Sequence, residues 1–108
     1  MSHQKHNVIG LALARRIAEG LKQHPEWLAL ARANLDRWAQ QNAGAPALLA
    51  CYREWRTILE LPVEGITAAL LDPTDRGQRL RQNSPFAGAL PPAEVWRMKR
   101  QVHETTAA

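Results

Sequence analysis

The stretch DPTDRGQRLRQNSPFAGALPPAEVW, residues 72–96, decides how the chain is organised. It combines the densest group of basic side chains, the only Phe of the chain and the closest succession of Pro and Gly. Because Pro and Gly interrupt regular structure, the stretch predicts short helices separated by tight turns. The segments before it have the pattern of ordinary amphipathic helices, which indicates a scaffold.

Three longer helices are predicted before this stretch, over residues 8–23, 25–41 and 46–60. In each of them apolar residues recur every three or four positions, so that one face of the helix is apolar. Proline suits the first turn of a helix, and Pro25 and Pro46 stand where the second and third helices begin.

Shorter helices are predicted over residues 63–71, 73–82 and 92–103, with Asp72 as the N-cap of the second of them. The helix over residues 73–82 has Leu80 as its only large apolar residue, so most of it is expected to be exposed.

The composition predicts one folded domain. A chain of 108 residues is too short for two separate cores, and 45% hydrophobic with 22% charged residues is typical of globular proteins. Four tryptophans, each able to bury a large area, anchor a shared core: Trp27, Trp38, Trp55 and Trp96. The predicted fold class is all-α, a single compact domain of five to six helices, similar to a helix bundle, with short Pro-punctuated C-terminal helices. It covers residues 7–104, between flexible tails at 1–6 and 105–108.

The single cysteine, Cys51, excludes an intramolecular disulfide and fits a reducing compartment. No apolar run approaches the roughly 20 residues that span a bilayer, and the N-terminus lacks the layout of a secretory signal. These features predict a cytoplasmic protein without a membrane partner.

The charge is unevenly distributed. The formal net charge of +4 arises from 14 Lys and Arg against 10 Asp and Glu. Residues 52–75 are net acidic, whereas residues 76–100 hold Glu94 as their only acid. The C-terminal third therefore carries the positive field.

No motif of catalysis or cofactor binding is present. One Cys and four well-separated His do not form a metal-ligand set, and there is no P-loop, GxGxxG, HExxH or GxSxG. Cys51 falls within an apolar stripe and is interpreted as structural, and Ser84 is interpreted as a turn residue beside Pro85. The sequence thus predicts a non-enzymatic protein with no metal and no cofactor.

Three interpretations of the basic region stay open. In the first, the protein binds a cognate protein through an arginine-rich C-terminal surface whose Arg, Trp and Phe side chains act as anchors. The residues assigned to this surface are Arg76, Arg79, Arg81, Phe86, Trp96, Arg97 and Arg100. A homodimer is a further alternative for the partner.

In the second interpretation, the helices within residues 63–82 form a helix-turn-helix that binds DNA. The residues that would contact bases or phosphates are Arg76, Gln78, Arg79, Gln82, Arg97 and Arg100. In the third, the same residues merely close the core, with Phe86 pinning its loop, and solvate a surface.

Three strings also resemble a family of small bacterial helical proteins of uncharacterised function: ARANLDRW at 31–38, EWRTIL at 54–59 and RLRQNSPFAGALPPAEVW at 79–96. The family pattern is N-L-x-R-W, then an E-W helix, then R-L-R-Q-S-S-P-F-A-G before a final E-x-W helix, so the resemblance spans about residues 31–100. Asn83 stands here in place of the first Ser of that pattern.

Such proteins resemble the partner members of toxin–antitoxin operons. The resemblance implies binding to a cognate protein and leaves open an autoregulatory role on DNA. The shared strings name no nucleophile, metal ligand or phosphate cradle.

Overall fold

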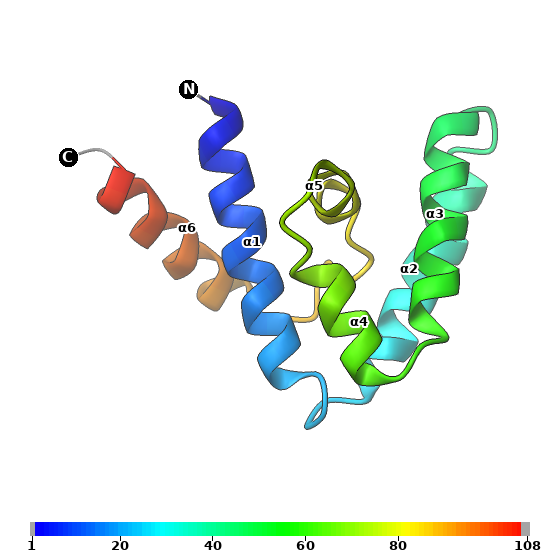
Figure 1. Ribbon diagram of the computed structural model, residues 1–108, viewed down its shortest axis with the longest axis horizontal. Coiled ribbons are helices and arrows are strands. Elements are labelled where there is room, and N and C mark those ends of the chain that lie inside the picture. Colours follow the sequence, from blue (N-terminus) through cyan, green and yellow to red (C-terminus); the bar gives the residue numbers. More distant parts are fainter. Residues whose placement is uncertain (1, 107–108) are drawn as a thin grey trace.

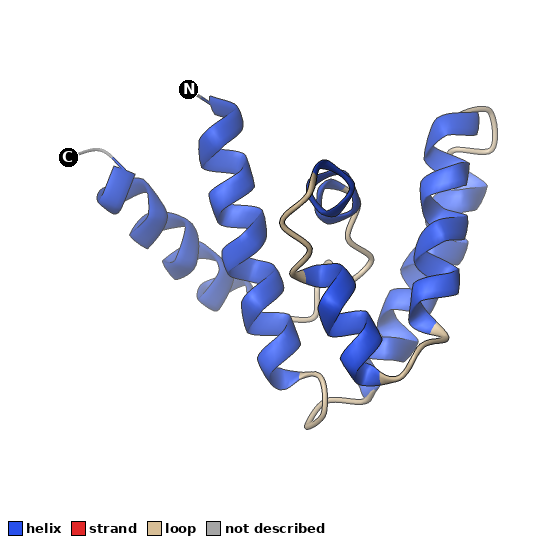
Figure 2. Ribbon diagram, in the orientation of Figure 1, coloured by secondary structure: helices blue, strands red, loops and turns tan. Residues whose placement is uncertain are grey.

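The computed structural model describes residues 2–106, with the side chains of residues 7–105. Within this part the chain forms six α-helices and no strand (Figures 1 and 2). They are α1 Ser2–Gly20, α2 Glu26–Gln41, α3 Pro46–Leu59, α4 Val63–Leu70, α5 Asp75–Gln82 and α6 Pro92–Thr106. The predicted all-α fold is confirmed. The radius of gyration, 14.0 Å, is near the value of about 13 Å expected of a compact chain of this length.

Two of the long helices differ in extent from the prediction. The first begins at Ser2 instead of residue 8, and α6 continues to Thr106 instead of residue 103. Helix therefore occupies residues 2–6 and 105–106, which the sequence predicts as parts of flexible tails. The rest of the predicted tails, residues 1 and 107–108, lies outside the described residues.

The N-cap of α5 is Thr74 and not Asp72, so that prediction was wrong. The Thr74 hydroxyl accepts a hydrogen bond from the backbone N–H of Gly77 at 3.4 Å, which satisfies one of the first donors of the helix. The Asp72 carboxylate acts one step earlier and accepts from both the backbone N–H of Thr74, at 2.8 Å, and its hydroxyl, at 2.6 Å. Asp72 thus orders the turn that presents the cap.

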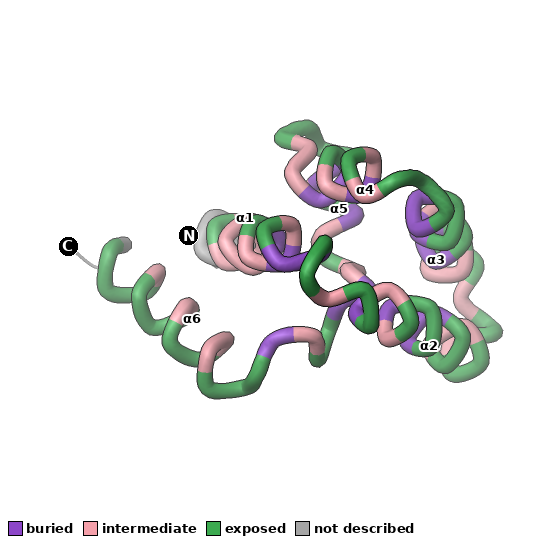
Figure 3. Tube along the Cα trace, turned by 90° about the horizontal axis from the view of Figure 1, so that it is seen from below, coloured by how far each residue is buried: buried purple, intermediate pink, exposed green. Residues whose placement is uncertain are grey.

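The helices are arranged with α4 and α5 in the middle. The hairpin of α2 and α3 lies on one side of them, and α1 lies on the other (Figure 1). The last helix, α6, packs chiefly on α1 at the edge of the molecule. Figure 3 shows α6 only as exposed or intermediate along its length, whereas buried residues of the other helices gather toward the centre.

Trp55 of α3 lies at the centre of the core. Its side chain is completely buried, as are those of Leu35 in α2 and Leu80 in α5. Trp27, in the first turn of α2, is also buried and lies against Gly20, where a Cβ would stand 2.7 Å from the indole ring. This close approach explains the glycine at the end of α1 and joins the α2–α3 hairpin to α1.

Candidate functional site

Asn34 of α2 anchors the loop between α5 and α6 through hydrogen bonds to its backbone. This asparagine is only 2% exposed, and its side-chain amide donates hydrogen bonds to the backbone carbonyls of Pro85, at 2.8 Å, and Ala87, at 2.9 Å. Its side-chain oxygen accepts from Arg37. A buried amide with all these partners fixes the path of the loop because each lost bond would leave a carbonyl unsatisfied.

Trp55 of α3 contacts both the end of α5 and the loop that follows it. The indole N–H donates to the backbone carbonyl of Leu80 at 3.0 Å, and the indole ring meets the Phe86 ring edge to face, with 6.3 Å between the ring centres. This arrangement is among the favoured ones for aromatic pairs. Phe86 is 4% exposed. A ring this buried offers little surface to a partner, which speaks against its assignment to a partner-binding surface and favours the interpretation of Phe86 as a plug of the core.

The three strings that carry the family resemblance meet at this point. Asn34 belongs to ARANLDRW, Trp55 to EWRTIL, and the atoms that they bind to RLRQNSPFAG. Most residues of these strings therefore have a structural role: they attach the segment between α5 and α6 to the α2–α3 hairpin.

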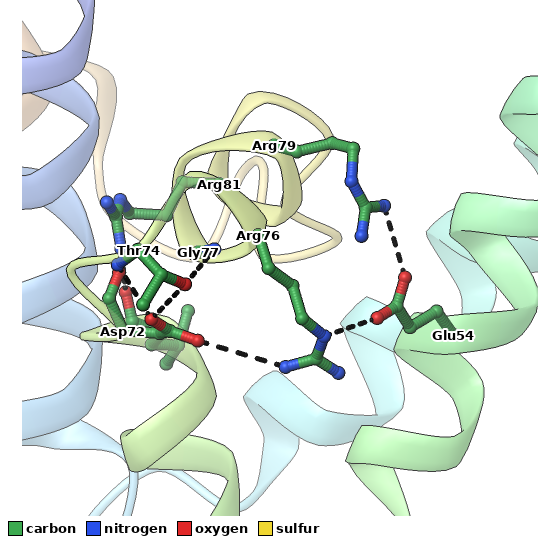
Figure 4. Close-up of polar contacts among 8 residues, drawn as sticks. Glu54, Asp72, Thr74, Arg76, Gly77, Arg79 and Arg81 are labelled. Carbon is green, nitrogen blue, oxygen red and sulfur yellow. Dashed lines mark hydrogen bonds and ion pairs between the residues drawn. The ribbon is translucent and has the colours of Figure 1, made fainter.

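Arg81 serves as a helix cap. Its guanidinium donates to the backbone carbonyls of Leu70, at 3.0 Å, and Asp72, at 2.6 Å, where α4 ends (Figure 4). The last carbonyls of a helix have no partner within it, and a cation there also suits the helix dipole. Arg81 was assigned to the partner surface, but its donors are directed inward.

Arg76 and Arg79 converge on one carboxylate of α3. Their guanidinium groups donate to Glu54 at 2.7 Å and 3.1 Å, one to each carboxylate oxygen (Figure 4). Burial alone would raise the pKa of Glu54, but the hydrogen bonds and charges of Arg79 and Arg76 lower it below its ordinary value. Arg76 also lies 3.9 Å from the Asp72 carboxylate. The positive charge predicted to face a partner is thus balanced within the chain.

These pairs also bear on the predicted helix-turn-helix. α4 and α5 are present, but α5 lies between α1 and α3 instead of at an edge, and two of its arginines face Glu54 (Figure 1). Of the other residues assigned to DNA, Gln78 is half-buried and Gln82 is exposed. The exposed polar side chains of α5 are those of Asp75, Arg76, Arg79 and Gln82. A recognition helix needs several side chains aimed into a groove, and the two arginines of this set are already held by Glu54.

The remaining assigned residues lie together on α6. Trp96 is 64% exposed, and Arg97 and Arg100 are exposed beside it. Lys99 adds a fourth exposed side chain to this group. Among the residues that the structure describes, none of these three cations pairs with a carboxylate, whereas Glu94 of the same helix is paired with Arg16 at 2.6 Å. We call Trp96, Arg97, Lys99 and Arg100 the α6 face.

Two hollows border α1 and α6. One, beside the α6 face, is lined by Ile9, Trp96, Lys99, Arg100, Val102 and His103. The other lies between α1, the loop after α5 and α6, and Lys99 lines both. Apolar hollows beside exposed aromatic and cationic side chains are able to receive an apolar group with negative charge near it.

Cys51 is buried, and its burial raises the pKa of its thiol above the ordinary value, against the opposing effect of Arg79. The described side chains contain no group of three or more His, Cys, Asp or Glu placed to hold a metal ion. None of the six helices, as far as the structure describes them, is long and apolar enough to cross a membrane.

Comparisons with known protein families, with curated proteins and with solved structures found no match.

The residue that sequence reasoning missed is Asn34. Asn34 lies on the apolar face of α2 together with Ala31, Leu35 and Trp38. A polar side chain on such a seam signals a buried hydrogen-bond partner. That partner is 51 residues away along the chain. The pattern of α2 could therefore indicate that Asn34 has a hydrogen-bond acceptor, but it could not identify which residue provides the acceptor.

Proposed function

We propose that this chain is a non-enzymatic binding protein, of antitoxin-like or adaptor type, which binds a cognate protein through the α6 face. The observation that carries the proposal is the exposure of Trp96, 64%, between cations that have no carboxylate partner among the described residues. The antitoxin-like class comes from the resemblance of the three strings alone.

Trp96 has the properties of an interface anchor. Tryptophan and arginine dominate the binding energy of protein interfaces, because they bury a large area and still form polar contacts. The other large apolar side chains with high exposure, Val8 and Leu61, are each 46% exposed. Trp96 exceeds both and is the only one of the three with arginines beside it in sequence.

The charge of the face indicates an acidic partner. Arg97, Lys99 and Arg100 project from about one turn of α6. Glu104 is the one acid of described α6 that has no pair with α1. Complementary charge raises the rate of association and selects the partner. We expect the partner to offer a pocket for the indole, rimmed by Asp and Glu. A second copy of this chain fits less well, because two such faces would repel each other.

Nucleic acid is the competing partner for a basic surface. Contacts to phosphate need cations but no exposed indole, and the arginines of α5 would have to leave Glu54 to reach DNA. The combination of Trp96 with the cations therefore favours a protein as the partner. Binding to DNA is one of the results that the experiment below can detect.

The experiment is affinity capture followed by reconstitution. The full chain is immobilised, the captured proteins are identified by mass spectrometry, and each candidate is purified and titrated against the chain. Trp96→Ser and the pair Arg97→Glu with Arg100→Glu test the α6 face. Leu61→Ser and Arg53→Glu are matched controls, because both side chains are exposed and belong to α3 or to the connection that follows it, on the opposite side of the molecule from α6 (Figure 1).

The proposal predicts that Trp96→Ser weakens binding by about 30-fold or more, the effect of losing about 2 kcal/mol at a hot spot. The controls should bind as the unaltered chain does. Equal binding by all variants, or a duplex DNA that binds with a steep dependence on salt and competes with no protein, would overturn it.

A further inference from the structure

The hollow that Gly10 lines lies on the other side of the α1–α6 contact from most of the α6 face. It has a volume of about 340 Å³ and is bounded by α1, the loop after α5 and α6. Its walls are mainly apolar, from Leu13, Ile17, Phe86, Leu90 and Val95. This size lies at the lower end of the range of about 300–1,000 Å³ that small-molecule sites occupy.

Gly10 forms part of the wall and has no structural reason to be glycine. In the interior of a helix, glycine costs about 1 kcal/mol relative to alanine. At Gly20 a Cβ would collide with Trp27, and at Gly65 it would stand 2.9 Å from Leu61. At Gly77 it would collide with the carbonyl oxygen of Asp72. At Gly10 a Cβ would meet no atom of the described residues within 4 Å, and the backbone there is ordinary helix.

The glycine therefore leaves space that the protein itself does not fill. Any larger side chain at position 10 would project toward the hollow or its rim, since Gly10 lines it. An unfilled apolar space is normally a loss of packing energy. A ligand that fills this space would explain why position 10 is a glycine.

The charge of the hollow is positive and is not balanced locally. Lys99 and Arg81 line it, and no carboxylate does. The Arg81 guanidinium is occupied by the carbonyls of Leu70 and Asp72, whereas Lys99 has no carboxylate partner among the described residues. Lys99 also lies on an exposed part of the rim. One available cation beside apolar walls suits an apolar molecule that carries one negative group.

We infer that this hollow binds a small amphipathic carboxylate, with its apolar body against Leu13, Ile17 and Phe86 and its carboxylate facing Lys99. This site shares Lys99 with the α6 face, but its apolar walls come from α1 and the loop after α5, and the inference does not depend on the proposed contact with a protein.

The test uses octanoate as the anionic probe and octylammonium as its cationic match, each titrated into the full chain and followed by amide chemical shifts. Octanoate should give saturable shifts at Gly10, Gly88 and Lys99, and octylammonium should bind about tenfold more weakly or worse. Lys99→Gln should remove most of this difference between the two probes, because it removes the charge and keeps a polar side chain.

Gly10→Leu tests the space itself. Leucine favours helix over glycine, so the fold should survive, while the side chain fills the hollow and octanoate affinity should fall at least about tenfold. Gly44→Ala is the matched control, because a Cβ at Gly44 also meets no atom within 4 Å but lies in the distant loop between α2 and α3. It should leave octanoate binding unchanged.

Three results would overturn the inference. They are the absence of saturable shifts at Gly10, undiminished octanoate binding by Gly10→Leu, and shifts confined to Trp96 and the outer side of α6. If octanoate does not bind while Gly10→Leu abolishes binding of a purified protein partner, the hollow belongs to the protein interface. The inference of a carboxylate-binding site would then be wrong.

Discussion

The indole N–H of Trp55 in α3 donates a hydrogen bond to the backbone carbonyl of Leu80 in α5 over 3.0 Å, and both side chains are completely buried. The bond crosses 25 residues of sequence and ties the central helix of the molecule to the α2–α3 hairpin. Together with Asn34 it fixes the segment that separates α5 from α6. The part of the sequence with the strongest family resemblance is thus used internally, and the surface left for a partner is on α6.

Replacement of Trp55 by Phe should lower the free energy of unfolding by about 3 kcal/mol. The change leaves a cavity and removes the indole donor, so that the carbonyl of Leu80 keeps only its hydrogen bond from the backbone N–H of Asn83 at 3.1 Å. Urea denaturation measures it, with Trp96→Phe as the control for the same substitution at an exposed site. The control should change the unfolding free energy by less than about 0.5 kcal/mol. Equal effects of the two variants would show that Trp55 is not at the centre of the core.

Asn34→Ala should loosen the loop before α6 more than the rest of the molecule. The carbonyls of Pro85 and Ala87 lose their donors, at a cost of about 2 kcal/mol in unfolding free energy. Hydrogen–deuterium exchange should rise first in residues 83–91. Asn42→Ala is a control, because Asn42 also bonds a backbone carbonyl and is only half-buried. Unchanged exchange in the loop would contradict the role given to Asn34.

The stability of the protein should fall on the acid side as Glu54 becomes protonated. The folded-state pKa of Glu54 is lowered relative to the unfolded chain, so its contribution is present above the ordinary pKa of glutamate, 4.5, and is lost as the pH falls through the lowered value. Hydrogen bonds from Thr74 lower the pKa of Asp72 as well. Protonation of Asp72 should therefore also reduce the stability of the protein on the acid side.

The variant Glu54→Gln isolates the first of these groups. The difference in unfolding free energy between the unaltered chain and the variant should be largest near about pH 7 and should shrink toward about pH 3. Measurement by urea denaturation at a series of pH values checks this. A difference that stays constant with pH would mean that Arg76 and Arg79 do not hold the Glu54 carboxylate in its charged form.

The thiol of Cys51 should react slowly in the folded protein. Burial raises its pKa and shields it from reagents, so little thiolate is available at neutral pH. Labelling with a thiol-specific disulfide reagent should be slow without denaturant and should accelerate when urea unfolds the chain. Rapid labelling of the folded protein would contradict this burial.

Much of the fold could be predicted from the sequence, because each helix carries its own apolar stripe and proline boundaries. The four central helices, α2 to α5, end within a few residues of their predicted limits. The cap of α5 was missed because Asp72 and Thr74 are both good capping residues, and only the geometry of the turn decides between them.

The candidate site was less predictable, because its deciding contacts are far apart along the chain. Arg76 and Arg79 look available in sequence, but their partner Glu54 is 22 and 25 residues away on another helix. The same holds for Arg81, which reaches carbonyls that no side-chain pattern reveals. Trp96 was assigned with these arginines, and the structure separates them onto different faces.

The most direct test of the account is hydrogen–deuterium exchange of the full chain with and without its purified, reconstituted partner. The account predicts new protection in α6 around residues 94–103, with little change in α5 or in the α2–α3 hairpin. Protection centred on residues 75–82, with α6 unchanged, would contradict it.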